Sequence, residues 1–343
     1  MSFIDSYNPH LLDGVQHVHF IGCGGSGTYP LIQILHSRGL TISGSDVEET
    51  KITKAERAMG VTVYLEHDAA HLGDAQLVVY SAAIHDENPE LKAARARGIP
   101  AVERSVMLGY VSRMYSHSVC VSGTHGKTTT TSMCTHIFMA AEADPTVMIG
   151  GTLPAIGSGY RVGKGETIIL ESCEYCNSFL SFFPTVAVIL NVDADHLDFF
   201  KDLDDIRHSF RRFAELLPAD GTLIINADTP KYEDIIRNLP CNVITYGLEH
   251  DADYQAADIT YDKYGHASFS VLRNGVKVGS YYLKVPGIHN VSNALAAIAL
   301  GHLLGLSEEV IIKGLGSFTG TDRRFQYKGE VAGVTIVDDY AHH

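Results

Sequence analysis

The stretch Ser118-Val119-Cys120-Val121-Ser122-Gly123-Thr124-His125-Gly126-Lys127-Thr128-Thr129 decides the fold of this 343-residue chain. Its apolar start predicts a buried strand, and a helix is expected directly after it, from Thr128 to about Ala141. A glycine-rich loop between a strand and a helix exposes backbone N–H groups that bind phosphate. Lys127 is placed to reach the β- and γ-phosphates, and the Thr128 hydroxyl can hold Mg²⁺. The stretch therefore predicts an ATP site in an α/β domain.

The loop departs from the full Gly-xxxx-Gly-Lys-Ser/Thr pattern, because Cys120 and Val121 stand where its first glycine is expected. The groups that bind phosphate and metal are nevertheless all present. The predicted ATP-binding residues of the loop are Gly123, Thr124, His125, Gly126, Lys127, Thr128 and Thr129.

A second glycine-rich loop, Gly22-Cys23-Gly24-Gly25-Ser26-Gly27, follows a strand predicted over 17–21 and precedes a helix through 31–35. Asp46 stands at the end of the next predicted strand, 40–43, where an acidic residue completes the fingerprint of a nucleotide diphosphate site. On these residues alone a dinucleotide, and hence a dehydrogenase, remains open. Two phosphate loops on two α/β units favour an enzyme that joins two substrates.

Short apolar runs alternate with helical patterns, which is typical of parallel sheets. The first unit is expected over 1–115, with further strands at 61–64 and 77–80 and helices at 89–97 and 105–114. The second is expected over 116–322, with strands at 118–121, 167–170, 186–190, 223–225 and 243–244, and helices at 291–304 and 307–315. Alternating polarity over 254–285, with a turn at 273–275, predicts a small antiparallel section.

The charge excludes several classes of partner. The chain has 26 Lys and Arg against 40 Asp and Glu, a net charge of −14, which argues against nucleic acid or an anionic membrane as the partner. A long apolar run and a signal-peptide pattern are both missing, so a cytoplasmic protein is predicted. The six scattered cysteines fit a reducing compartment. Cys173 and Cys176 have CxxC spacing, for which two incidental cysteines are favoured over a redox or zinc role.

Seven segments, in order along the chain, resemble the Mur ligase family. They are Gly22–Gly27, Tyr80-Ser81-Ala82-Ala83-Ile84, Gly123–Thr131, Asn191-x-Asp193-x-Asp195-His196-Leu197-Asp198, Pro286-Gly287-x-His289-Asn290-x-x-Asn293-Ala294, Gly320-x-x-Arg323-Arg324-Phe325 and Val337-Asp338-Asp339-Tyr340-Ala341-His342-His343. The chain departs from the family at Glu171-Ser172-Cys173-Glu174, where Glu-Ala-Asp-Glu is more usual. The departure keeps Glu171 and leaves the role of position 173 open.

The resemblance implies an ATP-dependent ligase of peptidoglycan precursor synthesis. The lactyl carboxylate of UDP-N-acetylmuramate would attack the γ-phosphate of ATP, giving an acyl phosphate and ADP. The amine of L-alanine would then attack that acyl phosphate and release phosphate. The implied partners are these small molecules and Mg²⁺, with no nucleic acid or membrane, in a monomer or weak dimer. UDP replaces the dinucleotide as the expected ligand of the first loop.

The resemblance also implies roles for individual residues. Thr128 and Glu171 would hold one Mg²⁺, and Glu171 and His196 a second. The implied catalytic residues are Lys127, Glu171, His196 and Arg324. Further ATP-binding residues would be Asn290, Asn293, Arg324 and Asp339, although Asn290 can also be read as a helix N-cap. The implied UDP-sugar residues are Gly22, Gly24, Gly25, Ser26, Gly27, Asp46, Ser81 and His125.

Two alternatives to the L-alanine reaction remain: a ligase that recycles a tripeptide onto UDP-N-acetylmuramate, and a non-catalytic UDP-sugar-binding protein. The retained Lys127, Thr128, Glu171 and His196 argue against the second. The family pattern further implies a C-terminal Rossmann-like domain that begins at 323–343. We therefore expect most of that domain to be missing from these 343 residues, and the chain to bind the UDP-sugar but to ligate poorly or not at all.

Overall fold

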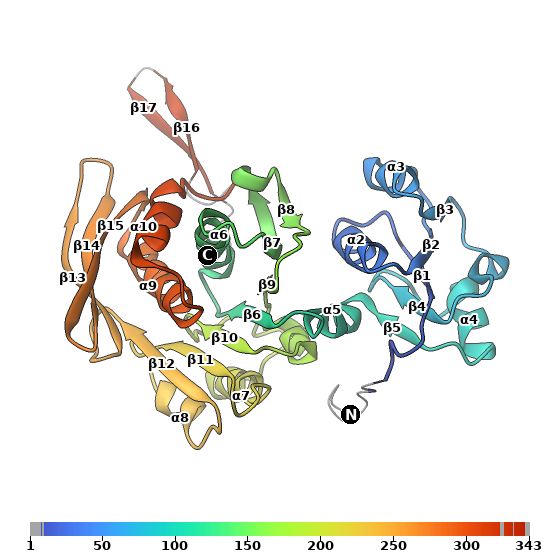
Figure 1. Ribbon diagram of the computed structural model, residues 1–343, viewed down its shortest axis with the longest axis horizontal. Coiled ribbons are helices and arrows are strands. Elements are labelled where there is room, and N and C mark those ends of the chain that lie inside the picture. Colours follow the sequence, from blue (N-terminus) through green and yellow to red (C-terminus); the bar gives the residue numbers. More distant parts are fainter. Residues whose placement is uncertain (1–7, 9, 323–325, 332, 340–343) are drawn as a thin grey trace. The chain divides into compact units, whose positions relative to one another are not determined.

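A computed structural model describes residues 8, 10–322, 326–331 and 333–339 (Figure 1). By the density of its internal contacts, the chain divides into two compact units, Met1–Met114 and Tyr115–His343. The α/β fold expected from the sequence, with parallel sheets and an antiparallel section, is confirmed. Among the described residues, no helix combines the length and apolar composition needed to cross a membrane.

The first unit is built on a parallel sheet of five strands in the order β3-β2-β1-β4-β5. The strands are β1 (His17–Ile21), β2 (Thr41–Ser45), β3 (Thr62–Tyr64), β4 (Leu77–Tyr80) and β5 (Ala101–Glu103). The central register pairs Phe20 with Gly44 on one side and with Val79 on the other. The strand order reverses between β1 and β4, and ligands of such sheets bind at the carboxyl ends of the strands beside this point. The loop 22–27 leaves β1 at that position.

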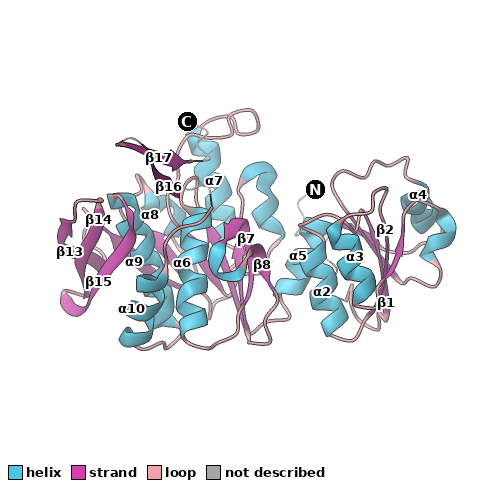
Figure 2. Cartoon of the chain, turned by 90° about the horizontal axis from the view of Figure 1, so that it is seen from above, coloured by secondary structure: helices cyan, strands magenta, loops and turns pink. Residues whose placement is uncertain are grey.

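The helices of this unit are α2 (Tyr29–Ser37), α3 (Lys51–Ala58), α4 (Pro89–Ala96) and α5 (Arg104–Ser112). In Figure 2, α2 and α5 lie on one side of the sheet and α4 on the other. Thr50 begins α3 with a capping box, and Asn88 caps α4. The sequence pattern did not predict α3, because its buried residues, Thr53 and Glu56, are both polar.

The second unit contains a ten-stranded sheet in the order β15-β14-β13-β12-β11-β10-β6-β9-β7-β8. Its parallel strands are β6 (His117–Ser122), β7 (Thr146–Leu153), β9 (Thr167–Glu171), β10 (Val186–Ile189), β11 (Thr222–Asn226) and β12 (Asn242–Gly247). The antiparallel strands are β8 (Ser158–Arg161) at one edge, and β14 (His266–Arg273) and β15 (Val276–Pro286) at the other. Between them and β12, β13 (Tyr254–Tyr261) pairs parallel to β12 and antiparallel to β14.

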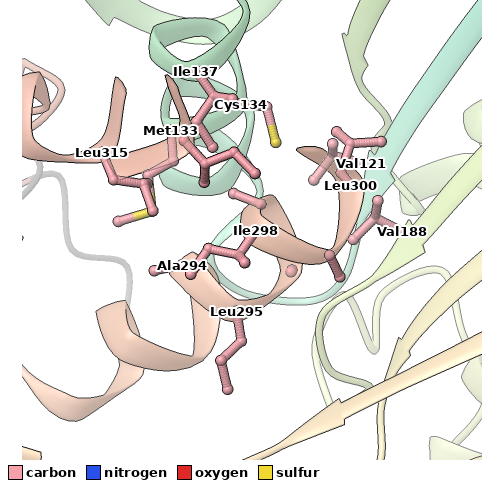
Figure 3. Close-up of a cluster of buried hydrophobic side chains, with 14 of the residues drawn as sticks. Val121, Met133, Cys134, Ile137, Val188, Ala294, Leu295, Ile298, Leu300 and Leu315 are labelled. Atoms are coloured by element: carbon pink, nitrogen blue, oxygen red, sulfur yellow. The ribbon is translucent and has the colours of Figure 1, made fainter. Parts of the chain in front are cut away.

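Helices α6 (Lys127–Ala140), α9 (Ile288–Leu303) and α10 (Glu308–Ser317) pack side by side against this sheet (Figure 2). Figure 3 shows buried side chains from all three helices, including Met133 and Ile137 of α6, Ile298 of α9 and Leu315 of α10, which belong to one hydrophobic cluster. A Cβ atom on Gly314 would lie 2.5 Å from the Ile137 Cα, so the close approach of α10 to α6 requires glycine there. The packing fixes the N-terminus of α6, and with it the phosphate loop.

The remaining elements were not all predicted. Two further helices were not predicted: α7 (Leu203–Ala214), a mostly polar helix whose apolar residues form one stripe, and the short helix α8 (Tyr232–Ile236). The apolar pattern also fails to indicate β5 and β8, whose residues are all half-buried, and β7, which mixes buried, half-buried and exposed residues. The interpretation of Asn290 as a helix N-cap is wrong, because α9 begins at Ile288 and Gly287 is its N-cap. The Asn290 side chain instead donates a hydrogen bond back to the Pro286 carbonyl (2.8 Å).

Candidate functional site

The loop between β6 and α6 contains two positions that require glycine. Gly123 has φ of +146° and Gly126 has φ of +85°, a region that side chains with a Cβ rarely enter. A Cβ on Gly123 would lie 2.8 Å from the Leu190 Cβ, and one on Gly126 would lie 2.6 Å from the Asn293 Oδ1. The predicted ATP residue Asn293 therefore lies against the loop.

Lys127 extends along the inside of the loop. Its Nζ donates to the carbonyls of Gly123 (2.6 Å) and Thr124 (3.1 Å) and to both carboxylate oxygens of Glu174 (2.9 and 3.1 Å). The Glu174 side chain is only 2% exposed. The lysine is thus held by a buried carboxylate at the position where its ammonium can turn to bound phosphate.

Thr128 and Glu171 meet beside the lysine. The Thr128 hydroxyl donates to Glu171 Oε1 (2.9 Å), and the Gly150 amide donates to Glu171 Oε2 (2.6 Å). A Cβ on Gly150 would lie 2.5 Å from Glu171 Oε1, so only glycine leaves the carboxylate this position. A hydroxyl and a carboxylate oxygen are hard ligands suited to Mg²⁺, which is commonly completed by substrate phosphates. The described residues contain no group of three His, Cys, Asp or Glu side chains that could hold a metal ion by themselves.

His196 lies near Glu174 in this structure. Its Nε2 is 3.8 Å from Glu174 Oε1, and its ring is 4.7 Å from that of Tyr175. The backbone of His196 has φ of +52°, which directs the chain sharply after Asp195. The Tyr175 hydroxyl donates to Asp198 (3.0 Å), which joins the segment after β9 to the segment after β10.

Asn191 fixes the outer side of the loop. Its side chain accepts from the His125 amide (2.7 Å) and donates to the His125 carbonyl (2.9 Å), while the His125 ring remains half-exposed. A cavity of about 440 Å³ opens here, and Gly126, Asn293 and His289 are among its lining residues. Burial lowers the pKa of His289, and the charge of Asp339 opposes this shift. A cavity beside a phosphate loop is where the base and ribose of a nucleotide can lie.

The structure brings most predicted ATP residues to one end of the sheet, and three others need separate description. Asn290 points its amide to Pro286 and to Asn293 rather than into the cavity. Arg324 lies outside the described residues. Asp339 follows β17 (Val334–Asp338), which pairs with β16 (Gln326–Val331) in a separate hairpin.

In the first unit, the loop 22–27 is tied to the end of β2. The Gly24 amide donates to Asp46 Oδ2 (2.9 Å), and a Cβ on Gly24 would lie 2.9 Å from Thr53 and 3.0 Å from the same Asp46 oxygen. A Cβ on Gly22 would lie 3.1 Å from that of Ser81. The residues predicted for the UDP-sugar, His125 apart, therefore lie together at the carboxyl edge of this sheet.

Glu174 and Asn191 are functional candidates that the sequence motifs did not predict. Asn191 lies in a segment that resembles the family, and Glu174 lies in the segment that departs from it at Cys173. A carboxylate facing Lys127 could have been sought at Glu174. Cys173 and Cys176 are free thiols on either side of this glutamate. Burial, and after it the charge of Glu174, raises the pKa of Cys173, which makes this thiol a poor nucleophile.

Comparison with known families agrees with this geometry. Residues 17–116 match the model described as "Mur ligase family, catalytic domain", and residues 121–301 match "Mur ligase middle domain". The two matches fall on the two units and each includes one of the glycine loops.

Individual relatives are similar over nearly the whole chain. The UDP-N-acetylmuramate–L-alanine ligase of Agathobacter rectalis is 52% identical over 95% of this chain and 72% of its own. The crystal structure of the UDP-N-acetylmuramate–alanine ligase of Thermotoga maritima is 30% identical, with a TM-score of 0.74 over 95% of this chain and 74% of that one. A ligase of UDP-N-acetylmuramate and L-alanyl-γ-D-glutamyl-meso-diaminopimelate from Neisseria meningitides is 28% identical, with a TM-score of 0.75 over 90% of this chain and 100% of that one. The chain belongs to the Mur ligase family.

Proposed function

We propose that this chain binds UDP-N-acetylmuramate and ATP and activates the lactyl carboxylate of the sugar for amide formation with L-alanine. The proposal rests chiefly on one arrangement, in which Lys127, Thr128 and Glu171 converge at the ends of β6 and β9. The relatives that are named L-alanine ligases and share up to 52% of their residues with the chain support the choice of substrates.

The chemistry needs charge neutralisation more than acid–base catalysis, because a carboxylate must approach a triphosphate. The Lys127 ammonium would leave Glu174 for the β- and γ-phosphates, and the loop amides would bind the remaining phosphate oxygens. The carboxylate oxygen then attacks the γ-phosphorus as the bond to the β–γ bridging oxygen breaks, which yields an acyl phosphate and ADP. The amine of L-alanine attacks the acyl carbon, loses a proton and expels phosphate.

Thr128 and Glu171 would hold Mg²⁺, which supplies charge stabilisation for the attacking and leaving oxygens when it is bound. Glu171 is already oriented by the Gly150 amide, so this ligand needs no rearrangement. His196 is the proposed ligand of a second ion.

Ligation of a tripeptide is the nearest competing reaction, since one structural relative joins a tripeptide to the same sugar nucleotide. The identity to that relative is 28%, against 52% to an L-alanine ligase, which favours L-alanine.

Calorimetry of the 343-residue chain with UDP-N-acetylmuramate and with ADP tests both binding sites. Mass spectrometry of a reaction with Mg²⁺, ATP, the sugar nucleotide and equal L-alanine and tripeptide then tests the acceptor. We expect both ligands to bind and any product formed to carry L-alanine. The Lys127→Ala variant should form no product. A chain that binds neither ligand, or that couples the tripeptide in preference, would contradict the proposal.

A further inference from the structure

The His196 imidazole lacks the hydrogen bond that commonly orients a metal-binding histidine. Such a histidine donates its second ring N–H to a carboxylate or a carbonyl, which fixes the ring. Among the residues that the structure describes, neither ring nitrogen of His196 makes a hydrogen bond, and Nε2 lies 3.8 Å from Glu174 Oε1, too far for one. The orientation of this ring therefore has another source.

Tyr175 packs its ring against that of His196. The two ring centroids are 4.7 Å apart, and the ring planes are inclined by 41°. This separation is typical of favourable contacts between aromatic rings. The tyrosine thus limits how far the imidazole can turn.

The same tyrosine contacts two further residues of the segment that carries His196. Its hydroxyl donates to Asp198 Oδ2 (3.0 Å), and its ring meets the Phe199 ring edge-on, with centroids 5.9 Å apart. One side chain therefore touches the segment through both a polar and an aromatic group.

The segment 196–200 forms a turn that needs such support. The amides of Phe199 and Phe200 both donate to the His196 carbonyl (2.9 Å each), and His196 has φ of +52°. A residue with a Cβ keeps this backbone conformation where its surroundings hold it. Phe200, which is buried, anchors one end of the turn in the core, and Tyr175 covers the other.

Tyr175 is itself held from the side of the phosphate loop. It begins the short helix η3 (Tyr175–Ser181) and directly follows Glu174, whose carboxylate binds Lys127 through both oxygens. The Asn177 amide donates to the Glu174 carbonyl (2.9 Å) and closes the backbone around the tyrosine. Two adjacent residues therefore have separate roles, since Glu174 faces the lysine and Tyr175 faces the histidine.

We propose that Tyr175 is a positioning residue that orients His196 for the second metal ion. The inference rests on the proposed function, which makes His196 a ligand of that ion. The ring contact keeps the imidazole from turning onto the Glu174 carboxylate, so Nε2 stays available to the ion. The hydroxyl bond to Asp198 holds the turn, and the tyrosine acts through the histidine without being a ligand.

The test uses Mn²⁺ with AMP-PNP, an ATP analogue that is not hydrolysed, and the 343-residue chain. Electron paramagnetic resonance counts the bound Mn²⁺, and its pulsed form detects the nitrogen of a coordinated imidazole. We expect two Mn²⁺ ions to bind with the nucleotide and a nitrogen coupling that disappears in His196→Ala.

The Tyr175→Ala variant should bind the second Mn²⁺ about 10-fold more weakly, as is usual when the support of a metal ligand is removed. Its nitrogen coupling should shrink as well. Metal-free ADP should bind as before, because Glu174 and Lys127 are retained. An equal loss of metal-free ADP binding would indicate a general disturbance of the site and would overturn the proposal.

The Tyr175→Phe variant keeps the ring and should recover most of the affinity for the second ion. A failure to recover it would contradict the ring contact as the cause. Tyr261→Ala is the matched control, because Tyr261 is an exposed tyrosine on β13 of the same unit. Thermal melting by circular dichroism establishes that each variant is folded.

Two further outcomes separate this inference from the proposed function. Unchanged Mn²⁺ binding in Tyr175→Ala, with the nitrogen coupling lost in His196→Ala, would overturn the role of the tyrosine alone. If the unchanged protein binds no second ion, or if the coupling survives in His196→Ala, both the positioning role and the proposed second metal site fail.

Discussion

Lys127 and Glu174 form an ion pair inside the loop that is proposed to bind ATP. The carboxylate contacts the ammonium through both oxygens, much as a phosphate would. Glu174 therefore competes with nucleotide for the lysine. When Lys127 turns to phosphate, the buried carboxylate loses its cation, which is costly unless another cation replaces it.

We expect the Glu174→Gln variant to bind ADP without Mg²⁺ about 5-fold more tightly, equivalent to about 1 kcal/mol. The glutamine keeps the shape of the side chain but removes the competing charge. The enhancement of ADP binding by Mg²⁺ should shrink in the same variant. Titration calorimetry with and without Mg²⁺ measures both quantities, and Glu309→Gln, an exposed glutamate of α10, is the control. Weaker metal-free binding by Glu174→Gln would contradict this view.

Glu56 is a buried acid beneath the first loop. It is 0% exposed, and among the described residues neither carboxylate oxygen has an N–H or O–H donor, although the Cys23 thiol lies against the carboxyl group. Burial raises the pKa of Glu56 to about 7, with the charge of Asp46 adding to the shift. Because the folded protein holds this proton more tightly than the unfolded chain, ionisation of Glu56 destabilises the fold. The folding free energy that protonated Glu56 contributes is therefore lost as the pH rises from about 4.5 to about 7.

The Glu56→Gln variant should remove this pH dependence. Relative to the unchanged protein, its free energy of unfolding should gain about 3 kcal/mol between pH 4.5 and pH 8, which corresponds to the shift in pKa. Urea unfolding followed by circular dichroism at several pH values measures the difference. Glu48→Gln, an exposed neighbour, should show no such trend. A constant difference between Glu56→Gln and the unchanged protein would count against the buried charge.

At the scale of elements, a second buried acid joins the strands of the first unit. Glu90 of α4 is 0% exposed, and its carboxylate lies 3.1 Å from His67 Nδ1, 3.2 Å from His71 Nδ1 and 3.5 Å from His19 Nε2. It also accepts from the Ser45 hydroxyl at the end of β2. Burial alone would raise the pKa of Glu90, but the bonds from His19 and Ser45 and the nearby histidine charges hold it below its ordinary value.

Removing this carboxylate should destabilise the unit strongly. We expect Glu90→Ala to lower the free energy of unfolding by about 3–5 kcal/mol, because it leaves several buried polar groups without a partner. The chain has 17 Tyr and no Trp, so tyrosine fluorescence in urea provides the measurement. Lys127 and its loop belong to the other unit, and ADP binding should persist. A loss below about 1 kcal/mol, the range of exposed ion pairs, would contradict the prediction.

Elements with a strong local signal could be predicted from the sequence. The helix after the phosphate loop was expected from Thr128 to about Ala141 and runs over Lys127–Ala140, because the glycine at its start and its buried face leave little freedom. By contrast, α3 and β7 lack a clear apolar period, and their neighbours rather than their own residues determine their structure. Tertiary packing outweighs local preference at such positions.

The same limit applies to the candidate site. Lys127 and Thr128 follow from the loop itself, whereas the register of β6 with β9, which pairs Val121 with Glu171, brings the carboxylates to them. A pairing between strands so distant in sequence cannot be derived from spacing. The family resemblance supplied Glu171, and only the structure revealed Glu174 as the partner of the lysine.

At the scale of the whole molecule, each compact unit carries its own phosphate loop. The two ligands should therefore be separable by mutation. Gly24→Val would place its side chain on Asp46 and Thr53, and we expect it to weaken UDP-N-acetylmuramate at least about 10-fold while ADP binds normally. Lys127→Ala should show the reverse pattern. Calorimetry measures the affinity of both variants for both ligands. An equal loss of affinity for the two ligands in either variant would contradict separate sites.

The neutralised lysine also affects how quickly a nucleotide arrives. With a net charge of −14 and the Lys127 ammonium already paired to Glu174, the protein repels an approaching polyanion at long range instead of attracting it. Added salt screens this repulsion, since the screening length is about 10 Å at 0.1 M ionic strength. The association rate constant for ADP, measured by stopped flow, should therefore rise with salt, whereas electrostatically steered binding slows.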